Sequence, residues 1–487
     1  MSAPSRPFTA IWDTTAGGWT PEDFQKNAAR AADHGYTAIA VPLRWKQAQA
    51  GGPDGYDFAS VDRTIARIKA KKLAVGLVID YSTPPAWVDA NQYCARDALG
   101  KIIADPVTRE PMIAVNAKQV RDWVGALFGE CVSRYGAAVA EFQGAGNPYL
   151  ESTWRYPVTR SLDHSKWALE GFRSFLHGKY VDIRALNEVW ESHYKDWVEI
   201  PVGEGGKKAV QSEFHAFRYY TYCSWAEFMR KAVKDARREA KFVFRLGGTK
   251  IAGDLYQLSF DLGRYARRSD VFIGCQISEP WQVNMVRTAA ELDGRPWGIQ
   301  VELGKTELAR DKKEMNEDLV KLAKGVYELG GFLEMKNWVH GPGTSLAGPD
   351  NWDDEAAWPF LGEIRKVRPM PQPPPRNNRR AIYVSAAEIQ FWDGTDLEAA
   401  RDRWNAETEI GKKPQVDLVS DGMFVDRPEI LKRYYAGIEV PFARVVAQDA
   451  RNALTQAARM GVRFRYHNPK VTGIQDEHGM PQPPLAE

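Results

Sequence analysis

Short apolar segments alternate along this chain with longer segments whose apolar residues recur at helical spacing. Leu73–Ile79 is an unbroken apolar run, which is typical of a strand that is buried on both faces. Just before it, Val61, Ile65 and Ile68 would share one face of a helix. This alternation predicts parallel strands joined by helices. Eight strands are predicted, at Phe8–Trp12, Thr37–Leu43, Leu73–Ile79, Ala138–Gln143, Phe242–Leu246, Val271–Ile277, Gly298–Leu303 and Gly331–Met335.

The number of strands favours a closed barrel over an open sheet. Eight strands with helices between them fit a (β/α)8 TIM barrel, whereas an open doubly wound sheet usually has fewer strands. A long and mostly helical insertion is predicted at about 154–240, between the fourth and fifth strands. We therefore expect an α/β protein in which residues 1–368 form the barrel.

A proline-rich segment marks a predicted domain boundary. Residues 369–375 contain five prolines and are followed by the polar run RNNRR, so a stiff linker is predicted at 369–380. Residues 381–467 then predict a smaller C-terminal α/β domain, and 468–487 a flexible tail. The elements predicted in this domain are strands at Ala381–Ser385, Gln415–Ser420, Val440–Val446 and Val462–Tyr466, and helices at Pro428–Tyr435 and Asp449–Met460.

Composition and motifs remove several classes of function. The formal net charge is +2 and the basic residues are scattered, so neither nucleic acid nor a membrane is an expected partner. No secretory signal or membrane span is visible, and four widely spaced cysteines suit reduced thiols, so we expect a cytoplasmic protein. The eight histidines form no metal-binding motif, and no P-loop or GxSxG sequence occurs. We therefore predict no metal and no cofactor.

Reactive side chains gather where the predicted strands end. In a TIM barrel the active site lies at the carboxyl ends of the strands, and these ends carry acids, an arginine and tryptophans. This mixture suits glycoside cleavage, because carboxylates can attack the anomeric carbon and protonate the leaving oxygen while aromatic faces hold sugar rings. The predicted substrate-binding residues are Arg44, Trp45, Tyr81, Asn147, Trp281 and Trp338.

Several motifs of the barrel region resemble those of a known family. Trp45–Trp87 contains GYDFASVD and TPPAW, Asp97–Gly100 reads DALG, and Phe175–Ser192 reads FLHGKYVDIRALNEVWES. Together they resemble the clan A glycoside hydrolases, and within them family 42, the β-galactosidase-like enzymes, over roughly residues 8–365. The resemblance implies a retaining, exo-acting hydrolase of a β-linked galactose-like sugar. It also implies a homo-oligomer built through the C-terminal domain.

The resemblance further assigns roles to individual residues. Glu302, in GIQVELG at the end of the seventh strand, matches the family's nucleophile. Arg44 matches the arginine of the second strand that holds this nucleophile ionised, although an ordinary ion pair would also explain it. Trp338 matches the tryptophan that forms the floor of the sugar subsite. The alternative is a tryptophan that is simply packed at the rim of the barrel.

The chain departs from the family at the end of the fourth strand. The family has Asn-Glu there, with the glutamate as general acid, whereas this chain has Asn147-Pro148. Neither an amide nor a proline can supply a proton with a suitable pKa. Glu151 on the same loop or Glu279 after the sixth strand would then supply the proton, unless both are ordinary loop carboxylates. Alternatively, the barrel has lost hydrolysis and only binds carbohydrate.

Overall fold

The structure is a computed structural model of the 487-residue chain. No helix in the described part of the chain is both long enough and apolar enough to cross a membrane. The described residues are 9–12, 28–29, 31–33, 36–104, 109–146, 152, 163–200, 208–247, 262–275, 279–303, 321–337, 380–387, 402–409, 416–440, 445–466, 474–476 and 481–482.

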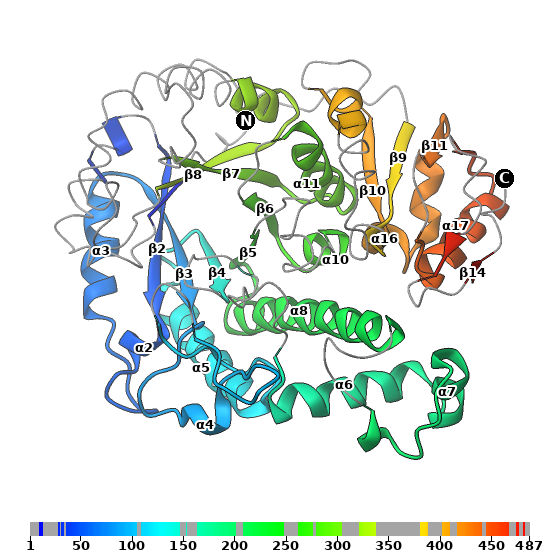
Figure 1. The fold of residues 1–487 in the computed structure, drawn as a ribbon. Helices are drawn as coiled ribbons and strands as arrows, with labels where there is room; N and C mark the ends of the chain where they lie inside the picture. The colour runs from blue at the N-terminus through cyan, green and yellow to red at the C-terminus, as the bar shows by residue number, and fades with distance from the viewer. Residues whose placement is uncertain are drawn as a thin grey trace, which may run out of the picture.

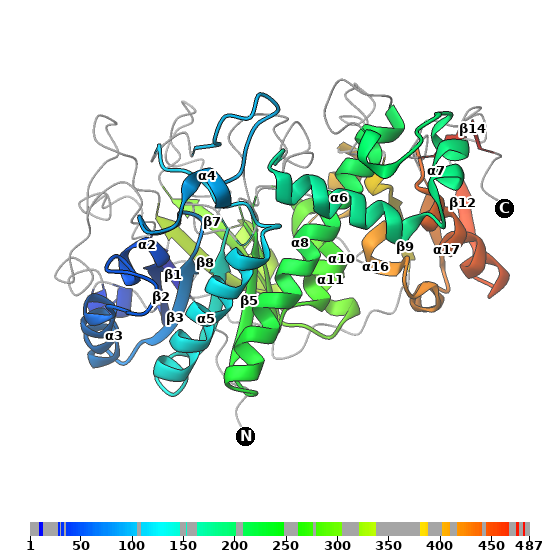
Figure 2. The ribbon, with the colours of Figure 1, turned by 90° about the horizontal axis from the view of Figure 1, so that it is seen from below.

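Eight parallel strands close into a barrel (Figures 1 and 2). They follow one another around it in chain order, and the first pairs with the last. The prediction of a (β/α)8 barrel followed by a smaller α/β domain is confirmed. The strands are β1 (Thr9–Trp12), β2 (Ala38–Arg44), β3 (Ala74–Asp80), β4 (Glu141–Ala145), β5 (Lys241–Leu246), β6 (Val271–Cys275), β7 (Trp297–Leu303) and β8 (Phe332–Asn337).

Most strand bounds lie close to the prediction, and the largest shift in the barrel is in β4. This strand begins at Glu141, whereas the sequence predicted a start at Ala138. The amides of Ala138 and Val139 both donate to the carbonyl of Tyr135 in a turn after helix α5 (Lys118–Tyr135), so this apolar pair is not available for the sheet. The other described helices of the barrel are α2 (Trp45–Ala48), α3 (Ala59–Ala70), α4 (Ala90–Tyr93), α10 (Leu262–Arg267) and α11 (Pro280–Leu292).

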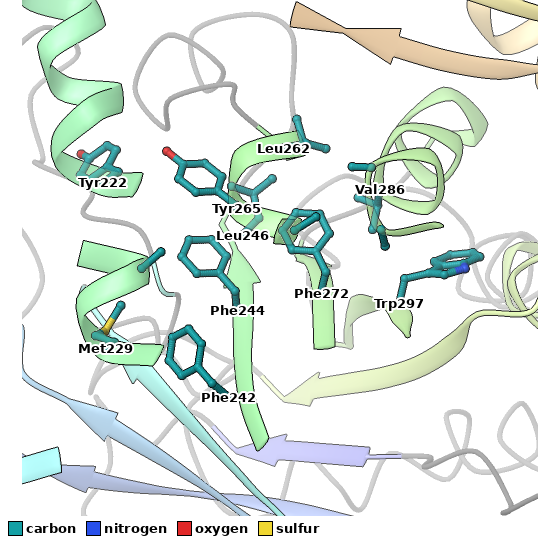
Figure 3. Close-up of a cluster of buried hydrophobic side chains, with 14 of the residues drawn as sticks. Tyr222, Met229, Phe242, Phe244, Leu246, Leu262, Tyr265, Phe272, Val286 and Trp297 are labelled. Carbon is teal, nitrogen blue, oxygen red and sulfur yellow. The ribbon is translucent and has the colours of Figure 1, made fainter. Parts of the chain in front are cut away.

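Strand β5 illustrates how the sequence pattern builds the two layers. Its side chains alternate between the two faces of the sheet. Phe242, Phe244 and Leu246 face the surrounding helices, where the ring of Phe244 stacks on Tyr265 of α10 with centroids 4.8 Å apart (Figure 3). The intervening Arg245 points into the barrel and contacts side chains of other strands. Both faces of the strand are therefore buried.

The predicted insertion between β4 and β5 is helical in its described part. A separate cluster of aromatic and aliphatic side chains holds its helices together, including Phe172, Trp190 and Phe214. Long helix α8 also packs against α5 and thereby ties the insertion to the barrel. The elements are α6 (Lys166–Lys179), α7 (Ile183–Trp190), the 3-10 helix η1 (Trp197–Glu199) and α8 (Lys208–Ala236).

The C-terminal domain contains a four-stranded parallel sheet in the order β10-β9-β11-β12. The strand in this region is β11 at Gly437–Val440, which begins three residues before the predicted strand Val440–Val446. Residues 441–444 of that prediction lie outside the described residues. The remaining elements are β9 (Arg380–Val384), β10 (Asp417–Ser420), α16 (Asp421–Phe424), the 3-10 helix η3 (Pro428–Arg433), α17 (Gln448–Arg459) and β12 (Phe464–Tyr466).

The C-terminal sheet packs directly on the outside of the barrel. Helix α11 lies beside β10, and one continuous apolar core extends through both (Figure 1). Arg287 of α11 forms a buried ion pair with Asp417 of β10 at 2.9 Å. Arg427 and Asp293 form a second, bidentate pair with both distances at 2.6 Å. The predicted linker lies outside the described residues except for Arg380, which begins β9.

The predicted flexible tail contains a short piece of secondary structure. Strands β13 (Ile474–Gln475) and β14 (Pro481–Gln482) pair in antiparallel fashion within it. Asp476, which follows β13, is buried and accepts a hydrogen bond from the side-chain amide of Gln482.

Candidate active site

The carboxyl ends of β2 and β3 bring together an arginine and an aspartate. Arg44 and Asp80 are partners in the strand register, and their side chains approach to 3.9 Å between Nε and Oδ2. Asp80 also accepts hydrogen bonds from the backbone amide of Ser82 at 3.0 Å and its hydroxyl at 2.6 Å. Its carboxylate is therefore fixed from two sides. Sequence reasoning placed Arg44 here but did not include Asp80 in the predicted site.

The predicted aromatic residues beside this pair are part of the packing around the mouth. Trp45 is fully buried, donates its ring N–H to Gln49 at 2.6 Å, and meets Trp87 edge to face. Tyr81 is fully buried and stacks on Trp225 of α8 with ring centroids 5.3 Å apart. Burial raises the pKa of Tyr81 well above its ordinary value. Both rings fix the walls of the site, and their predicted contact with a sugar stays a prediction.

The loop after β4 carries three of the predicted positions, Asn147, Pro148 and Glu151, all of which lie outside the described residues. The next residue, Ser152, is buried and is hydrogen-bonded to β5. Its amide donates to the carbonyl of Arg245 at 2.8 Å, and its hydroxyl accepts from the Arg245 amide at 3.0 Å. This double contact holds Ser152 against the carboxyl-terminal part of β5.

Strand β7 carries the predicted nucleophile at its end. Residues 302 and 303 of β7 are in register with Lys336 and Asn337 at the end of β8. The structure describes the backbone of Glu302 but not its side chain, and Trp338 lies outside the described residues. Glu302 therefore occupies the strand end that the sequence predicted for it.

A buried polar network fills the barrel below these strand ends. The guanidinium of Arg245 forms an ion pair with Glu334 of β8, with the shortest distance at 2.5 Å, and contacts Gln143 of β4. Gln300 of β7 donates to the same Glu334 carboxylate at 2.5 Å. Burial alone would lower the pKa of Arg245, but Glu334 and Glu141 raise it, and the net shift is upward. The guanidinium therefore stays charged inside the barrel.

Sequence reasoning did not identify this network, although a signal was present. Each of its members interrupts an otherwise apolar strand, as Arg245 does in KFVFRL and Glu334 does in FLEMKN. A charge at a position that must be buried requires a partner. The sequence alone does not say which strand supplies it.

Glu279 and Trp281 lie at the start of α11, against the C-terminal domain. The Glu279 carboxylate accepts hydrogen bonds from the ring N–H of Trp281 and from the side-chain amide of Asn405, both at 2.8 Å. Trp281 is almost fully buried and packs on Trp404, with ring centroids 5.8 Å apart. Both residues thus contribute to the contact between the barrel and the C-terminal domain.

No group of three or more histidine, cysteine, aspartate and glutamate side chains suited to a metal ion occurs among the described residues. The four cysteines are buried thiols, and burial raises the pKa of Cys94 to about 12. A thiol with so high a pKa is a poor nucleophile at neutral pH.

Comparison with known proteins identifies the family that the barrel resembles. Residues 17–245 match a family model described as Beta-galactosidase, that of glycoside hydrolase family 42. The chain resembles this family, as its sequence predicted. At the level of enzyme class, the predicted glycosidase is confirmed by this match.

Solved structures of low sequence identity share the fold over nearly the whole chain. A β-galactosidase from Marinomonas ef1 is 16% identical with a TM-score of 0.69, and the alignment covers 98% of this chain and 78% of that one. A β-galactosidase from Halorubrum lacusprofundi is 15% identical with a TM-score of 0.74, covering 98% and 75%. An exo-carrageenase of family 42 from Bacteroides ovatus is 15% identical with a TM-score of 0.68, covering 100% and 68%. The fold that this chain shares with these proteins therefore includes both the barrel and the C-terminal sheet.

Proposed function

We propose that this protein is a retaining, exo-acting glycoside hydrolase that cleaves a β-linked galactose-like sugar, with Glu302 as nucleophile. The observation that carries the proposal is the place of Glu302 at the carboxyl end of β7 in a closed barrel of this family's fold. The active site of such a barrel lies where the strands end, and residues 302 and 303 are in register with Lys336 and Asn337 at the end of β8. A galactose-like substrate is supported by the solved neighbours, which are β-galactosidases and an exo-carrageenase.

Arg44 is proposed to keep the nucleophile ionised. An arginine near a carboxylate favours its charged form. The place of Arg44 at the end of β2, already bound to a fixed Asp80, supports this role because its guanidinium is held at the mouth. Asn147 and Trp338 are proposed to contact the sugar, by their match to the family's positions at the ends of strands four and eight.

Glu151 is the proposed general acid and base. Its neighbour Ser152 is fixed to β5, which supports a position of the loop at the carboxyl end of the barrel. Glu279 is a weaker candidate, because its carboxylate already accepts two hydrogen bonds at the contact with the C-terminal domain. In a retaining enzyme the two carboxyl groups would lie about 5–5.5 Å apart.

The test is turnover of nitrophenyl α- and β-glycosides by the wild type and single variants. We expect Glu302→Ala to abolish release, and added azide to restore it, since azide can occupy the space of the lost carboxylate. Glu151→Gln should retain much of its activity on these substrates, whose leaving group needs little protonation, but lose about 10²–10⁴-fold on a galactosyl disaccharide. Glu279→Gln and the exposed Glu188→Ala are the controls and should keep wild-type activity on both substrates.

Two results would overturn parts of this proposal. Undiminished activity of Glu302→Ala would remove the nucleophile assignment, and a product of inverted anomeric configuration would remove the retaining mechanism. If no glycoside is cleaved while galactose binds saturably, the protein is a carbohydrate-binding barrel without hydrolysis. The Asn147-Pro148 departure makes this the second candidate function.

The expected homo-oligomer and cytoplasmic location are also proposals. The four buried thiols suit a reducing compartment. The resemblance to family 42, in which the domain after the barrel builds oligomers, supports self-association. Light scattering at several protein concentrations would test it, because a constant monomer mass would exclude a stable oligomer.

A further inference from the structure

A cavity of about 530 Å³ lies where the C-terminal sheet meets the helical insertion. Helices α6, α8 and α10 form one side of it. The segments that follow β9 and β10, together with the start of α17, form the other side. This volume is in the usual range for sites that hold a small molecule. None of the predicted substrate-binding residues that the structure describes lines it.

The cavity lies at the position where open parallel sheets usually bind ligands. Strand β9 is followed by a connection to β10 on one side, whereas β11 is followed by a connection to β12 on the other. The carboxyl ends of β9 and β11 are thus the point where the strand order reverses, and ligands of such sheets bind there. Ala386 and Ala387 after β9, and Gln448 at the start of α17, line the cavity.

The cavity is lined by equal numbers of basic and acidic side chains, which limits the charge that its ligand can carry. Three basic and three acidic side chains line it, namely Lys179, Arg264, Arg268, Glu213, Asp421 and Asp449. An anion would meet the carboxylates, and a cation would meet the basic groups. A hydroxyl group suits both, because it donates to a carboxylate and accepts from an ammonium or a guanidinium.

Two of the carboxylates are held in place by other side chains. Glu213 is 1% exposed and accepts hydrogen bonds from Lys179 at 2.8 Å and from the Tyr180 hydroxyl at 2.5 Å. Asp421 is buried and accepts from the Tyr383 hydroxyl at 2.7 Å. These groups are ordered before a ligand arrives, which reduces the entropy lost on binding.

Arg268 offers a donor that no acid within the described residues occupies. Its guanidinium lines the cavity and donates a hydrogen bond from Nη1 to the carbonyl of Arg264 at 3.1 Å. The aromatic wall adds an apolar surface, because Phe175 and Tyr220 lie with ring centroids 5.5 Å apart and Tyr220 is 59% exposed. We propose that this cavity binds a neutral sugar or polyol, separately from the barrel mouth.

Hydrogen exchange tests the proposal because it shows where in the chain a ligand binds. Binding in the cavity can then be distinguished from binding at the barrel mouth. Backbone exchange is measured with D-galactose, D-glucose, myo-inositol and inorganic phosphate in turn. We expect at least one of the three polyols to protect peptides from the start of α17 and from residues 212–223 of α8, and phosphate not to do so. This protection should persist in Glu302→Ala, because the cavity does not use the barrel mouth.

Two cavity variants and one control separate binding in the cavity from a general effect. Ala216→Trp fills the space from α8 and should remove the protection, whereas Ala236→Trp, at the exposed end of the same helix, should not. Arg268→Gln should weaken binding about tenfold. This smaller change keeps the proposal testable if Ala216→Trp fails to fold. No protection with any polyol, or protection unchanged in both cavity variants, would overturn the proposal. Protection by phosphate alone would overturn the sugar assignment.

Discussion

Asp163 shows how one buried carboxyl can make stability depend on pH. It joins the start of α6 to the barrel by accepting hydrogen bonds from the amides of Arg96 and Ser165 and from the Ser165 hydroxyl. Burial nevertheless raises its pKa to about 6. Between its unfolded pKa, near 4, and about 6, the folded state therefore binds the proton that the unfolded state has lost. The free energy of unfolding must fall as the pH rises through this window.

We expect Asp163→Asn to remove this dependence. Relative to the wild type, the variant should gain stability between pH 4 and pH 7 by about 2–3 kcal/mol. Urea unfolding at several pH values in this range measures the difference. Asp182→Asn is a control of opposite sign, because the backbone amide of Ala185 lowers the pKa of Asp182. Parallel stability curves for the wild type and Asp163→Asn would contradict the prediction.

The residues at the strand ends differ in how far the sequence could place them. Arg44 and Glu302 were placed correctly at their strand ends, because the end of an apolar run is visible in the sequence. The burial of Trp45 and Tyr81 could not be foreseen. A tryptophan or tyrosine at a mouth can face a ligand or a neighbouring helix, and here α8, which begins more than a hundred residues later, supplies the neighbour of Tyr81.

At the scale of elements, a buried ion pair connects two strands inside the barrel, in addition to apolar packing. Arg245 of β5 and Glu334 of β8 are both almost completely buried. Removing one partner of such a pair leaves an uncompensated charge and destabilises a protein by about 3–5 kcal/mol. Replacing both partners by apolar residues of similar volume is often close to neutral.

Glu334→Leu should therefore lower the free energy of unfolding by about 3–5 kcal/mol, and Arg245→Met with Glu334→Leu should recover most of the loss. Urea unfolding at neutral pH measures both variants. The exposed pair of Lys118 and Asp122 is the matched control, and Asp122→Leu should change stability by less than about 1 kcal/mol. A double variant as unstable as Glu334→Leu alone would refute this reasoning.

Elements could be predicted where an apolar run and the polar residues that bound it indicate the same limits. Strand β3 was found to within one residue at each end, because it is an apolar run bounded by Lys72 and by Asp80-Tyr81. Strand β11 was misplaced, because the run VPFARVV is more apolar than the true strand GIEV. Pairing with β9 on one side and β12 on the other decides the position of this strand.

At the scale of the whole molecule, the barrel and the C-terminal sheet share one core. Gly263 of α10 lies so close to α16 that a Cβ there would be 2.4 Å from the Cα of Met423. Arg287 meets Asp417 in this contact, with both side chains nearly buried. Such an interface makes independent unfolding of the two parts unfavourable. We expect the wild type to unfold in one calorimetric transition.

Arg287→Ala should separate this transition into two, because it removes the guanidinium that pairs with the buried Asp417 at the centre of the contact. Differential scanning calorimetry measures the change. Arg264→Ala removes an exposed pair with Asp426 at the edge of the same contact and should leave a single transition. A single transition in Arg287→Ala as well would mean that the apolar core alone couples the two parts.

The sequence by itself determined the elements, their order and the chemistry of their ends. Apolar period, helix spacing and proline position are local properties, so the eight barrel strands and the helical insertion could be recognised from them. Tertiary structure decided which charges meet inside the barrel and which tryptophans are covered. It also decided that the C-terminal sheet joins the barrel core and encloses a cavity with α6 and α8. These features depend on contacts between residues that are distant in the chain. A local sequence pattern does not indicate which distant residue a given side chain will contact.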